Sequence, residues 1–459
     1  MRRSSMKASA LDDAVGPAVR PSRRTSTGEV GLLLSLAAGG IGLGVILGLP
    51  LVDGTVHEIG APGGWTLFLG SVTGLIGTYL ALLMVLMAAR IPTLERALGR
   101  GGVMRWHKNL SVLTISFILA HAVLTTAAYA KIAKVGIAHE LGVLIDSYPD
   151  MITAFVALGL MLLIGLVSLP WLRRRLSREN WWLLHLLIYV ALVLSFAHEL
   201  VLGPSFVNHP VVQWIWAGAW ILAGLALVVY RVLVPLLRSL RHELTVVAVE
   251  PQPNGVTKIL LQGQYLEDLQ LQGGQFFEWR FLTRGRWWQA HPFSVVDRQG
   301  DTLRLMVRPI GDFSANLIKL GVGTRVWFEG PYGNFTAAQQ RKDRVLLIAG
   351  GIGVTAIRGL LEDLPRWSRP VLVLRVTAKT DLVLLDELER LASERNGKVY
   401  ILSGDRTMVD LRTIAGNIKD FQSRDIFISG SPGFVEAVRD VFISLGVKRR
   451  QLHVEAYTI

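Results

Sequence analysis

The sequence contains no cysteine among its 459 residues. This absence excludes disulfide bonds, thiolate metal sites, iron–sulfur clusters and covalently attached c-type haem. Any protein-bound metal must therefore rest on histidine or carboxylate side chains. Charged residues are also sparse, at 18%, whereas 51% of the chain is hydrophobic and the mean hydropathy is +0.42. A chain this long and this apolar predicts that part of it lies in a lipid bilayer.

Acidic residues are the scarcer charge, with 35 Asp and Glu against 48 Lys and Arg, which gives a net charge of +13. A basic balance can indicate nucleic-acid binding, but here the basic residues lie beside apolar runs and form no single basic face. We therefore expect no nucleic-acid partner. The N-terminal segment lacks the short apolar core and small-residue cleavage site of a signal peptide, so residues 1–29 are predicted to form a retained, disordered basic tail.

Six apolar stretches reach the length of about 20 residues that a bilayer-spanning helix requires. They are roughly Val30–Leu51, Trp65–Ala89, His107–Ala130, Met151–Leu172, Trp181–Val201 and Val211–Leu233. The sequence thus predicts a six-helix transmembrane bundle over residues 30–240.

Basic residues in alternate connections set the predicted orientation of these spans. They are Arg2, Arg3, Lys7, Arg20, Arg23, Arg24, Arg90, Arg96, Arg100, Arg105, Arg173, Arg174, Arg175 and Arg178. The other connections are mildly acidic and carry only Lys131 and Lys134 as basic residues. The positive-inside rule then places both termini in the cytosol, which an even number of spans allows. We expect a multi-pass protein of the plasma membrane.

After about Arg241 the long apolar stretches give way to short β-branched and aromatic runs between glycines and prolines. These runs are Leu244–Val249, Thr257–Leu261, Gln275–Phe281, Leu303–Val307 and Arg325–Glu329. They predict an antiparallel β-barrel over residues 241–340. From Arg344 apolar strands alternate with helical segments, which is typical of a parallel α/β sheet and defines a last domain over residues 341–459. Its predicted strands and helices are Val345–Ile348, Ala356–Leu364, Val371–Val376, Leu384–Arg395, Val399–Leu402, Ile426–Ser429 and Phe434–Leu445.

Four histidines lie inside the predicted spans, where ionisable residues are rare and usually functional. His107 and His121 are fourteen residues apart, and His185 and His198 are thirteen apart. At a rise of about 1.5 Å per residue, each spacing separates two side chains by roughly 20 Å along the helix. Both spans run in the same direction, so the first histidines share one depth and the second share another. Neutral imidazole is a good axial ligand for haem iron, and the pattern predicts two stacked bis-histidine haems.

The alternative is that these histidines cap helices or bond to a neighbouring carbonyl, which is common for a single intramembrane histidine. Two pairs at matched depth favour haem ligation. The spacings also predict how far the two histidines of one helix differ in direction around the helix axis. In an ideal α-helix a spacing of fourteen residues falls about 40° from whole turns, and a spacing of thirteen falls about 140° from them. We therefore expect the fifth helix either to be overwound or to present His185 and His198 to haems at different azimuths.

Two segments of the predicted barrel carry a flavin-binding pattern. His291-Pro292-Phe293-Ser294 follows one strand, and residues 308–314 (Arg-Pro-Ile-Gly-Asp-Phe-Ser) follow another. A flavin requires a platform for its ring, a hydroxyl near the ribityl or phosphate group, and backbone N–H groups at the pyrophosphate. The first segment alone is equally typical of a turn before an aromatic core residue, but both together predict FAD. The predicted contacts are His291, Pro292, Phe293, Ser294, Arg308, Gly311, Phe313 and Ser314.

A glycine-rich turn, Ala349–Thr355, lies between a predicted strand and a predicted helix. In that setting Gly350, Gly351 and Gly353 let the backbone approach a pyrophosphate, and the helix N-terminus at Thr355 attracts its charge. Two basic residues follow the next two strands and are the candidates for a 2′-phosphate, which predicts NADPH over NADH. They are Lys379 and Arg406. The alternative for Lys379 is a solvated lysine in a turn.

Together these features resemble the NADPH oxidase and ferric reductase superfamily, from about residue 30 to the end of the chain. The resemblance implies six membrane helices with haem histidines on the third and fifth at these same spacings. It also implies a dehydrogenase half similar to ferredoxin–NADP reductase, in which 291–294 binds FAD and 350–355 is the pyrophosphate loop. Gly330–Gly333 resembles the turn that joins the two dehydrogenase domains.

The resemblance assigns hydride transfer to the C-terminal part of the chain. Residues 429–433 (Ser-Gly-Ser-Pro-Gly) are similar to the family's Cys-Gly-Pro-Pro-Gly motif, so Ser429 stands where a cysteine usually contacts the nicotinamide, and Gly430 joins the nucleotide site. Glu455 and Tyr457 resemble the Glu-x-Tyr ending of plant-type reductases, in which the aromatic ring covers the flavin. The alternative is an edge strand with Tyr457 in the core.

The sequence therefore predicts a six-helix transmembrane bundle binding two b-type haems, an antiparallel β-barrel FAD domain and an α/β NADPH domain. Electrons from cytosolic NADPH would pass through FAD and both haems to an extracytoplasmic acceptor. Three acceptors stay open, namely dioxygen, a ferric or cupric chelate, and an extracytoplasmic redox protein. Dioxygen is preferred, although Thr125 stands where the animal oxidases carry a second outer histidine.

Overall fold

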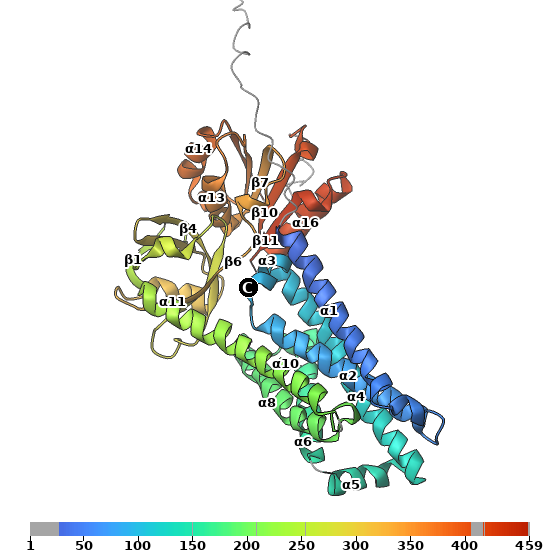
Figure 1. Ribbon diagram of the computed structural model, residues 1–459. Helices are drawn as coiled ribbons and strands as arrows, with labels where there is room; N and C mark the ends of the chain where they lie inside the picture. The colour runs from blue at the N-terminus through green and yellow to red at the C-terminus, as the bar shows by residue number, and fades with distance from the viewer. Residues whose placement is uncertain are drawn as a thin grey trace, which may run out of the picture.

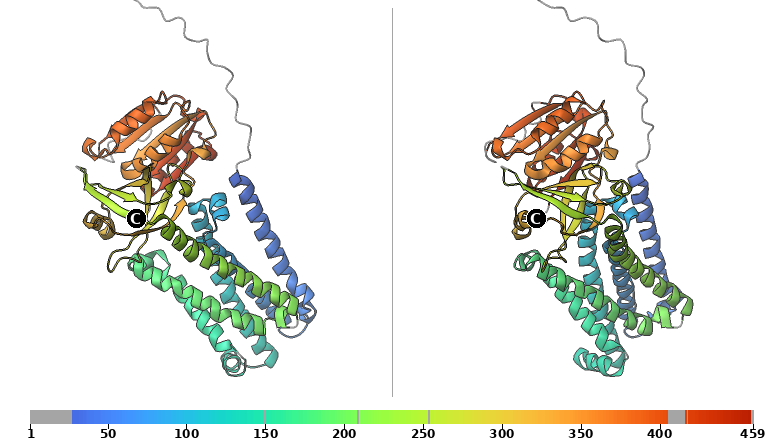
Figure 2. Two further views of the ribbon diagram at one scale, coloured as in Figure 1. Left: turned by 60° about the vertical axis from the view of Figure 1, so that its left-hand side comes forward. Right: turned by 90° about the vertical axis from the view of Figure 1, so that its left-hand side faces the viewer.

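The computed structural model describes residues 27–459 except 149, 208, 253, 405–415, 417, 458 and 459. Long helices form one end of an elongated molecule, and two β-containing units form the other (Figure 1). Figure 2 shows from two further sides that the barrel lies between the helices and the α/β unit. The predicted basic tail, residues 1–29, lies largely outside the described residues, since α1 begins at Thr27.

Five helical runs in the described part of the chain are long and apolar enough to cross a membrane. They are α1 (Thr27–Val52), α2 (Gly64–Ala88), α4 (Arg100–Ala133), α8 (Arg178–Leu202), and the run of α10 (Pro210–Val228), a π-helical turn (Val229–Leu233) and α11 (Val234–His242). At most a third of the most apolar window of each span is buried inside the protein. The remaining apolar side chains face outward, as lipid contact requires.

The fourth predicted span, Met151–Leu172, is shorter than expected. Helix α6 (Met151–Val167) has 17 residues and follows α5 (Ile137–Ser147) at a bend of 116°. The described residues therefore contain five candidate spans, or six if this bent pair counts as one. The span predicted to reach Leu172 ends at Val167. Pro170 begins the separate helix α7 (Pro170–Arg173), because proline has no N–H with which to continue a helix.

Short helices connect the spans. They are a 3-10 turn at Thr55–Glu58, α3 (Pro92–Leu98) and α9 (Pro204–Val207). Among the spans, α2 packs most extensively against α4, and α6 packs against α8. These pairings place α2 beside α4 and α6 beside α8, and α4 and α8 carry the four intramembrane histidines.

The second unit is a six-stranded antiparallel sheet in the order β1-β2-β5-β4-β3-β6. Its strands are β1 (Thr245–Pro251), β2 (Thr257–Gln262), β3 (Phe276–Phe281), β4 (His291–Gln299), β5 (Thr302–Val307) and β6 (Val326–Tyr332). The Val246 N–H donates to Thr324 O at 2.9 Å, and the Val326 N–H donates to Leu244 O at 2.8 Å, so the two edges of the sheet meet. Closure of this kind removes exposed strand edges. Inside, Phe277, Trp279 and Phe328 are fully buried.

The third unit is a five-stranded parallel sheet in the order β11-β10-β7-β8-β9, which agrees with the predicted parallel α/β arrangement. Its strands are β7 (Arg344–Gly350), β8 (Val371–Val376), β9 (Lys398–Ser403), β10 (Arg424–Gly430) and β11 (Leu452–Ala456). Its longer helices are α13 (Val354–Asp363), α14 (Leu385–Ser393) and α16 (Pro432–Ser444). The sequence had predicted four strands, and β11 adds a fifth at the edge beside β10.

Arginines hold the barrel to the α/β unit. Arg304 of β5 pairs with Asp297 of β4 and, at 2.7 Å, with Glu387 of α14. Arg358 of α13, only 4% exposed, pairs with Asp297 at 3.2 Å and with Glu387 at 3.1 Å. Because these carboxylates lie in different units, the cluster fixes the angle at which the flavin motif faces the nucleotide loop.

Candidate functional site

Helices α4 and α8 bring the four intramembrane histidines together as two facing pairs. The ring centroids of His107 and His185 lie 6.3 Å apart with their planes at 65°. Those of His121 and His198 lie 6.5 Å apart at 63°. The predicted pairing in depth is therefore present at both levels. Helix α8 is α-helical from Arg178 to Leu202, so the pairs form without an overwound segment.

The separation of each pair fits a metal ion bound between two imidazoles. A nitrogen-to-metal bond of about 2 Å on each side, plus roughly 1.2 Å from each nitrogen to its ring centre, requires ring centres about 6.4 Å apart. Nδ1 of His185 and Nδ1 of His198 are buried without a hydrogen-bond partner among the described residues. Nδ1 of His121 lies 2.8 Å from the carbonyl oxygen of Gly70. A carbonyl accepts only, so Nδ1 carries the proton and Nε2 is free for a metal.

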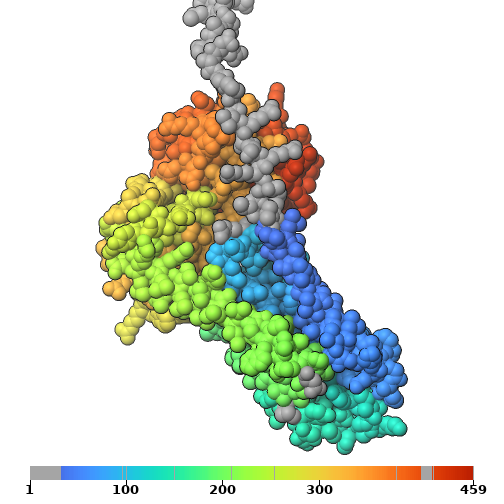
Figure 3. All heavy atoms as spheres, in the orientation of Figure 1, coloured from blue at the N-terminus to red at the C-terminus, as the bar shows by residue number. Residues whose placement is uncertain are grey.

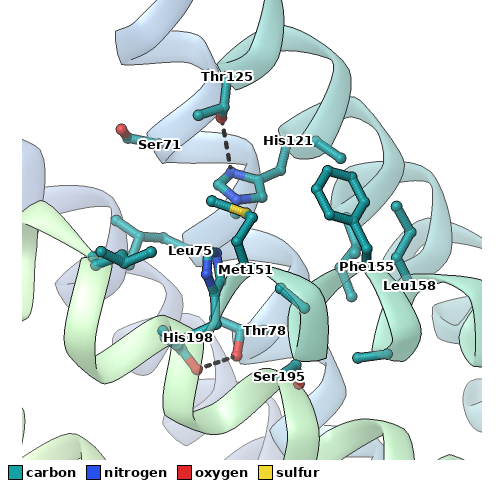
Figure 4. Close-up of a pocket in the computed structure, with 18 of the residues that line it drawn as sticks. Ser71, Leu75, Thr78, His121, Thr125, Met151, Phe155, Leu158, Ser195 and His198 are labelled. Carbon is teal, nitrogen blue, oxygen red and sulfur yellow. Dashed lines mark hydrogen bonds between the residues drawn. The ribbon is translucent and has the colours of Figure 1, made fainter. Parts of the chain in front are cut away.

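We call His107 and His185, which lie nearer the dehydrogenase half, the inner pair, and His121 and His198 the outer pair. The outer pair lines a cavity of about 280 Å³ between α2, α4, α6 and α8 (Figure 4). Both imidazoles enter it, together with apolar side chains such as Leu75 and Met151 and hydroxyls such as Ser71. Glycines of α2 let this helix approach the His121 and Thr125 side chains of α4 closely. A Cβ on Gly74 would lie 2.7 Å from His121 Nδ1, and a Cβ on Gly70 would lie 2.7 Å from the Thr125 hydroxyl.

The inner pair has an aromatic neighbour toward the dehydrogenase half. The indole of Trp181 stacks on the His185 ring with centroids 4.9 Å apart and planes at 21°. The guanidinium of Arg173 lies 4.6 Å from the Trp181 ring centre. Stacking on Trp181 restricts the orientation of the His185 ring.

The flavin motif opens β4 and lies beside the start of α8. His291 stacks on Phe313 with ring centroids 3.6 Å apart. Burial, and secondly the charge of Arg178 on α8, lower the pKa of His291 to about 4. The imidazole is therefore neutral at physiological pH. The electrostatic influence of Arg178 and the stacking of Trp288 on Trp182 indicate that the flavin motif lies near the helix that carries His185.

The remaining residues of the flavin pattern take up their positions through backbone contacts. Pro292 pairs with Glu278 across the sheet, and the carbonyl of Phe293 accepts a hydrogen bond from the Trp279 indole at 2.9 Å. The Ser314 hydroxyl accepts from the N–H of Gly311 at 3.1 Å, which shapes the second segment. Nε of Arg308 is buried without a hydrogen-bond partner in the described ranges. A buried guanidinium nitrogen of this kind fits an anion such as a pyrophosphate.

Glycines of the nucleotide loop occupy positions that larger residues would obstruct. A Cβ on Gly353 would lie 2.4 Å from the Ser429 carbonyl oxygen, and a Cβ on Gly350 or Gly430 would lie within 2.7 Å of the Phe434 ring. Gly351 has φ +57° and open space around it. The loop thus has the bare backbone that phosphate binding at a helix start requires.

Four predicted site residues converge where the barrel meets the α/β unit. The Tyr457 hydroxyl lies 3.1 Å from the Ser294 hydroxyl, and Ser429 and Thr355 are close enough to influence its pKa, which burial raises. The Ser429 hydroxyl is buried without a hydrogen bond of normal geometry in the described part of the chain. Glu455 is the neighbour of Ser429 across β10 and β11. The flavin motif, the nucleotide loop and the C-terminus therefore share one site.

The two basic candidates for a 2′-phosphate are less well placed. Arg406 lies outside the described residues, and so does the side chain of Lys379, whose backbone opens a 3-10 turn after β8. Their assignment stays a prediction.

Sequence reasoning missed a charged cluster at the junction of the membrane and dehydrogenase halves. Glu329 of β6, 1% exposed, pairs with Arg90 after α2 at 2.8 Å, with Arg231 of the π-helical turn at 2.9 Å and with Arg280 of β3 at 2.7 Å. Burial raises the pKa of Glu329, but the three arginines outweigh it and hold that pKa below its usual range. Arg231 lay within the last predicted span, and a charge inside a span is a signal that could have found the cluster.

Residues 73–196, which include three of the four paired histidines, match the family described as the ferric reductase like transmembrane component. Dual oxidase 2 of Sus scrofa is 28% identical over 232 residues, which cover 48% of this chain and 14% of that protein. Dual oxidase 2 of Homo sapiens is 29% identical over 204 residues, covering 42% and 12%. The chain is similar to the NADPH oxidase and ferric reductase superfamily, and it covers only a small part of the length of these dual oxidases. The predicted resemblance to this superfamily is thereby confirmed, and with it the class of NAD(P)H-linked membrane oxidoreductases.

Other relatives and solved structures resemble a part of the chain. The probable dihydroorotate dehydrogenase B electron transfer subunit of Pyrococcus horikoshii is 35% identical over 95 residues, 21% of this chain and 36% of that protein. Among solved structures, an Amycolatopsis cytochrome P450 reductase is 21% identical with a TM-score of 0.42, covering 48% of this chain and 70% of its own. A ferredoxin NADP⁺ reductase of Neisseria gonorrhoeae is 19% identical with a TM-score of 0.41, covering 47% and 98%.

Proposed function

We propose that this protein transfers electrons from cytosolic NADPH, by way of FAD and two b-type haems, to an acceptor on the other side of the membrane, most simply dioxygen. The observation that carries the proposal is the pair of facing imidazoles at each of two levels between α4 and α8, both with the separation that a bound metal requires. The flavin motif lies near the N-terminal end of α8, which the positive-inside rule would place on the cytosolic side, and this position supports the proposed direction of transfer.

The residues of each site fit the groups they would hold. His107 and His185 would ligate an inner haem, and His121 and His198 an outer one. FAD would lie on the segments 291–294 and 308–314, with NADPH on the loop 350–355. When bound, FAD converts a two-electron hydride donor into a source of single electrons, and the haems carry those electrons across the membrane.

The chain's own side chains orient and shield these groups. The Gly70 carbonyl fixes the tautomer of His121, and the Trp181 ring restricts the rotation of His185. Tyr457 occupies the meeting point of the flavin and nucleotide motifs, where it would exclude water until nicotinamide displaces it. Ser429 has a hydroxyl free to contact the nicotinamide.

Dioxygen is proposed as the acceptor because of the side chains that would surround the outer haem in the cavity lined by the outer pair. Its walls are mainly apolar, with residues such as Leu75, Met161 and Leu192, and a small uncharged molecule enters such a site at a lower desolvation cost than a charged chelate. A ferric or cupric chelate, or an extracytoplasmic redox protein, is the alternative outcome of the test.

The test uses the purified full chain in detergent, reconstituted with haem and FAD. We expect two haems per chain by pyridine haemochrome, and NADPH-driven reduction of dioxygen when dioxygen and ferric chelates are offered separately. His121→Ala should lose one haem and acceptor reduction while NADPH still reduces the flavin. The matched control is His139→Ala, an exposed histidine of α5, which should behave as the wild type. One haem or none in fully loaded wild-type protein would overturn the assignment of the four histidines.

A further inference from the structure

The loop between β3 and β4, residues 282–290, here called the barrel loop, combines exposed aromatic and basic residues. Its sequence is Leu-Thr-Arg-Gly-Arg-Trp-Trp-Gln-Ala, and it contains no acidic residue. Trp287 is 60% exposed and Arg284 is also exposed. This composition alone does not identify a binding surface, so the position of the loop decides what it contacts.

The barrel loop touches the end of a membrane span. The Trp288 ring stacks on the Trp182 ring of α8, with centroids 6.2 Å apart and planes at 22°. Trp182 lies in the second turn of α8, which is one of the five candidate spans. In Figure 3 part of the barrel, in yellow, projects toward the helical half. The loop therefore lies at the level where the span leaves the bilayer.

The segment that leads into α8, residues 171–182, is also rich in arginine and exposed tryptophan. Residues 171–182 contain four arginines and one acidic residue, Glu179. Trp171 is 56% exposed and Trp182 is 40% exposed. The Arg175 guanidinium lies 5.8 Å from the Trp171 ring centre. Tryptophan prefers the headgroup level of a membrane, and arginine binds phosphate through paired hydrogen bonds.

We propose that the barrel loop and residues 171–182 together form a binding surface for anionic phospholipids in the leaflet that faces the dehydrogenase half. Charge complementarity supports this occupant, because the two segments carry six arginines against one glutamate. Continuity with a span supports it as well, since lipid already surrounds α8 at this level. Binding of a soluble protein would not explain why the tryptophans lie at the depth of the lipid headgroups.

Lipid binding here would also position the flavin motif. His291 follows the barrel loop directly, and the loop is fixed to α8 only three residues before His185. An anchored loop would hold the flavin site at a constant distance from the inner histidine pair. This consequence rests on the proposed function, whereas lipid binding itself does not.

The test measures binding of fluorescent phosphatidylglycerol and fluorescent phosphatidylcholine to the purified full chain in detergent micelles. One variant combines Arg284→Gln with Arg286→Gln, and another is Trp287→Ala. The matched controls come from segment 366–369 (Arg-Trp-Ser-Arg) of the α/β unit, in which Ser368 is buried and the other three side chains are exposed. They are Arg366→Gln with Arg369→Gln, and Trp367→Ala. Trp367 is 57% exposed, close to the value for Trp287.

We expect the wild type and both controls to prefer phosphatidylglycerol, and each lost arginine to weaken its binding about fivefold. Trp287→Ala should weaken the binding of both lipids. Equal affinity of the wild type for the two lipids, or a double variant that binds phosphatidylglycerol as the wild type does, overturns the proposal. Displacement of the lipid by millimolar inorganic phosphate identifies a free-phosphate site and overturns it too.

Haem content and NADPH oxidation of the same preparations keep the two proposals separate. Lipid binding with the expected pattern in a protein that takes up no haem would remove the proposed function and leave the lipid surface standing. Two haems with no lipid preference would do the reverse. The flavin content of each variant is also measured, and a value equal to that of the wild type indicates that the barrel is folded.

Discussion

The hydroxyls of Tyr457 and Ser294 lie 3.1 Å apart, although the residues are 163 positions apart in the chain and belong to different β-units. The backbone N–H of Tyr457 donates to Gly430 O at 3.0 Å, which continues the pairing of β11 with β10. Burial raises the pKa of the Tyr457 phenol, so the phenol is a neutral hydrogen-bond donor at physiological pH. The C-terminus thus closes the flavin motif against the nucleotide site.

Removal of the Tyr457 ring should tighten nucleotide binding. Aromatic stacking is worth about 0.5–1.5 kcal/mol beyond burial, so Tyr457→Ala should bind NADP⁺ roughly 2–10-fold more tightly and discriminate less well against NADH. Titration of the flavin absorbance and the ratio of kcat/KM values measure both effects. Tyr457→Phe keeps the ring and serves as the control. A lower melting temperature with unchanged nucleotide affinity would instead make Tyr457 a core residue behind an edge strand.

Neutralising Glu329 should loosen the junction between the two halves. Glu329→Gln leaves three arginines without their shared carboxylate, at a cost of about 2–4 kcal/mol, because these arginines are 20–27% exposed and partly solvated. Stopped-flow spectra should show flavin reduction by NADPH at the wild-type rate but slower haem reduction. The control is Glu250→Gln, which breaks an exposed pair with Lys258. Wild-type haem reduction and an unchanged melting temperature would show that the cluster does not position the halves.

The parallel sheet and the histidine pairs could be predicted from local sequence. Runs such as Ile426–Ser429 are apolar throughout because both faces of a central parallel strand are buried, and β10 is buried along its whole length. The pairs followed from helical rise alone. The directions in which His185 and His198 point around the axis of α8 could not be predicted, because they depend on how α8 packs against its neighbours. The continuous α-helix favours haems at different azimuths over an overwound helix.

Other features depend on contacts between distant parts of the chain. The sequence did not predict strand β4, because its first residues contain a proline and polar side chains, which are typical of a turn. The cluster on Glu329 joins residues 90, 231, 280 and 329, and no local pattern relates them. The helix α6 ends early because Pro170 interrupts an apolar stretch whose composition alone suggested a longer span.

Lys379 is predicted to select NADPH over NADH. A lost charge-assisted contact to the 2′-phosphate costs about 1.5–3 kcal/mol, so Lys379→Ala should lower kcat/KM for NADPH and leave that for NADH unchanged. Steady-state kinetics with both nucleotides provide the ratio. Lys398→Ala, at the exposed start of β9, is the control. An unchanged ratio in Lys379→Ala would leave Lys379 as a solvated turn residue.

His291 should make the stability of the flavin-free protein depend on pH. Its pKa is about 4 in the folded chain against a model-peptide value of 6.5, so between these limits the unfolded chain binds more protons. The free energy of unfolding therefore falls as the pH falls from 6.5 to about 4. His291→Gln cannot titrate, and its melting temperature should fall less over that window. His139→Gln should follow the wild type, and parallel curves for all three proteins would exclude His291 as the cause.

Gly74 of α2 should be required for the outer histidine pair. A Cβ at this position would lie 2.7 Å from Nδ1 of His121 and 3.1 Å from two carbons of the same ring, so the imidazole or the helix must move. Overpacking of this kind costs about 1–3 kcal/mol, and it would also separate His121 from the Gly70 carbonyl that fixes its tautomer. Gly74→Ala should therefore lose or distort the outer haem site while the inner site stays intact.

The measurement is the haem content and low-temperature absorption or electron paramagnetic resonance spectrum of the oxidised protein, in which two bis-histidine sites give separate signals. Gly159→Ala on α6 is the matched control, since no atom lies within 4 Å of its added Cβ. We expect one unchanged signal and one that is shifted or missing in Gly74→Ala, and two unchanged signals in the control. Because the change lies in a neighbouring helix and not in a ligand, loss of only the outer signal would show that α2 sets the geometry of His121. Two wild-type signals in Gly74→Ala would contradict this prediction. They would mean that α2 and α4 lie further apart in the haem-loaded protein than in this structure, so that an added Cβ at position 74 does not reach His121.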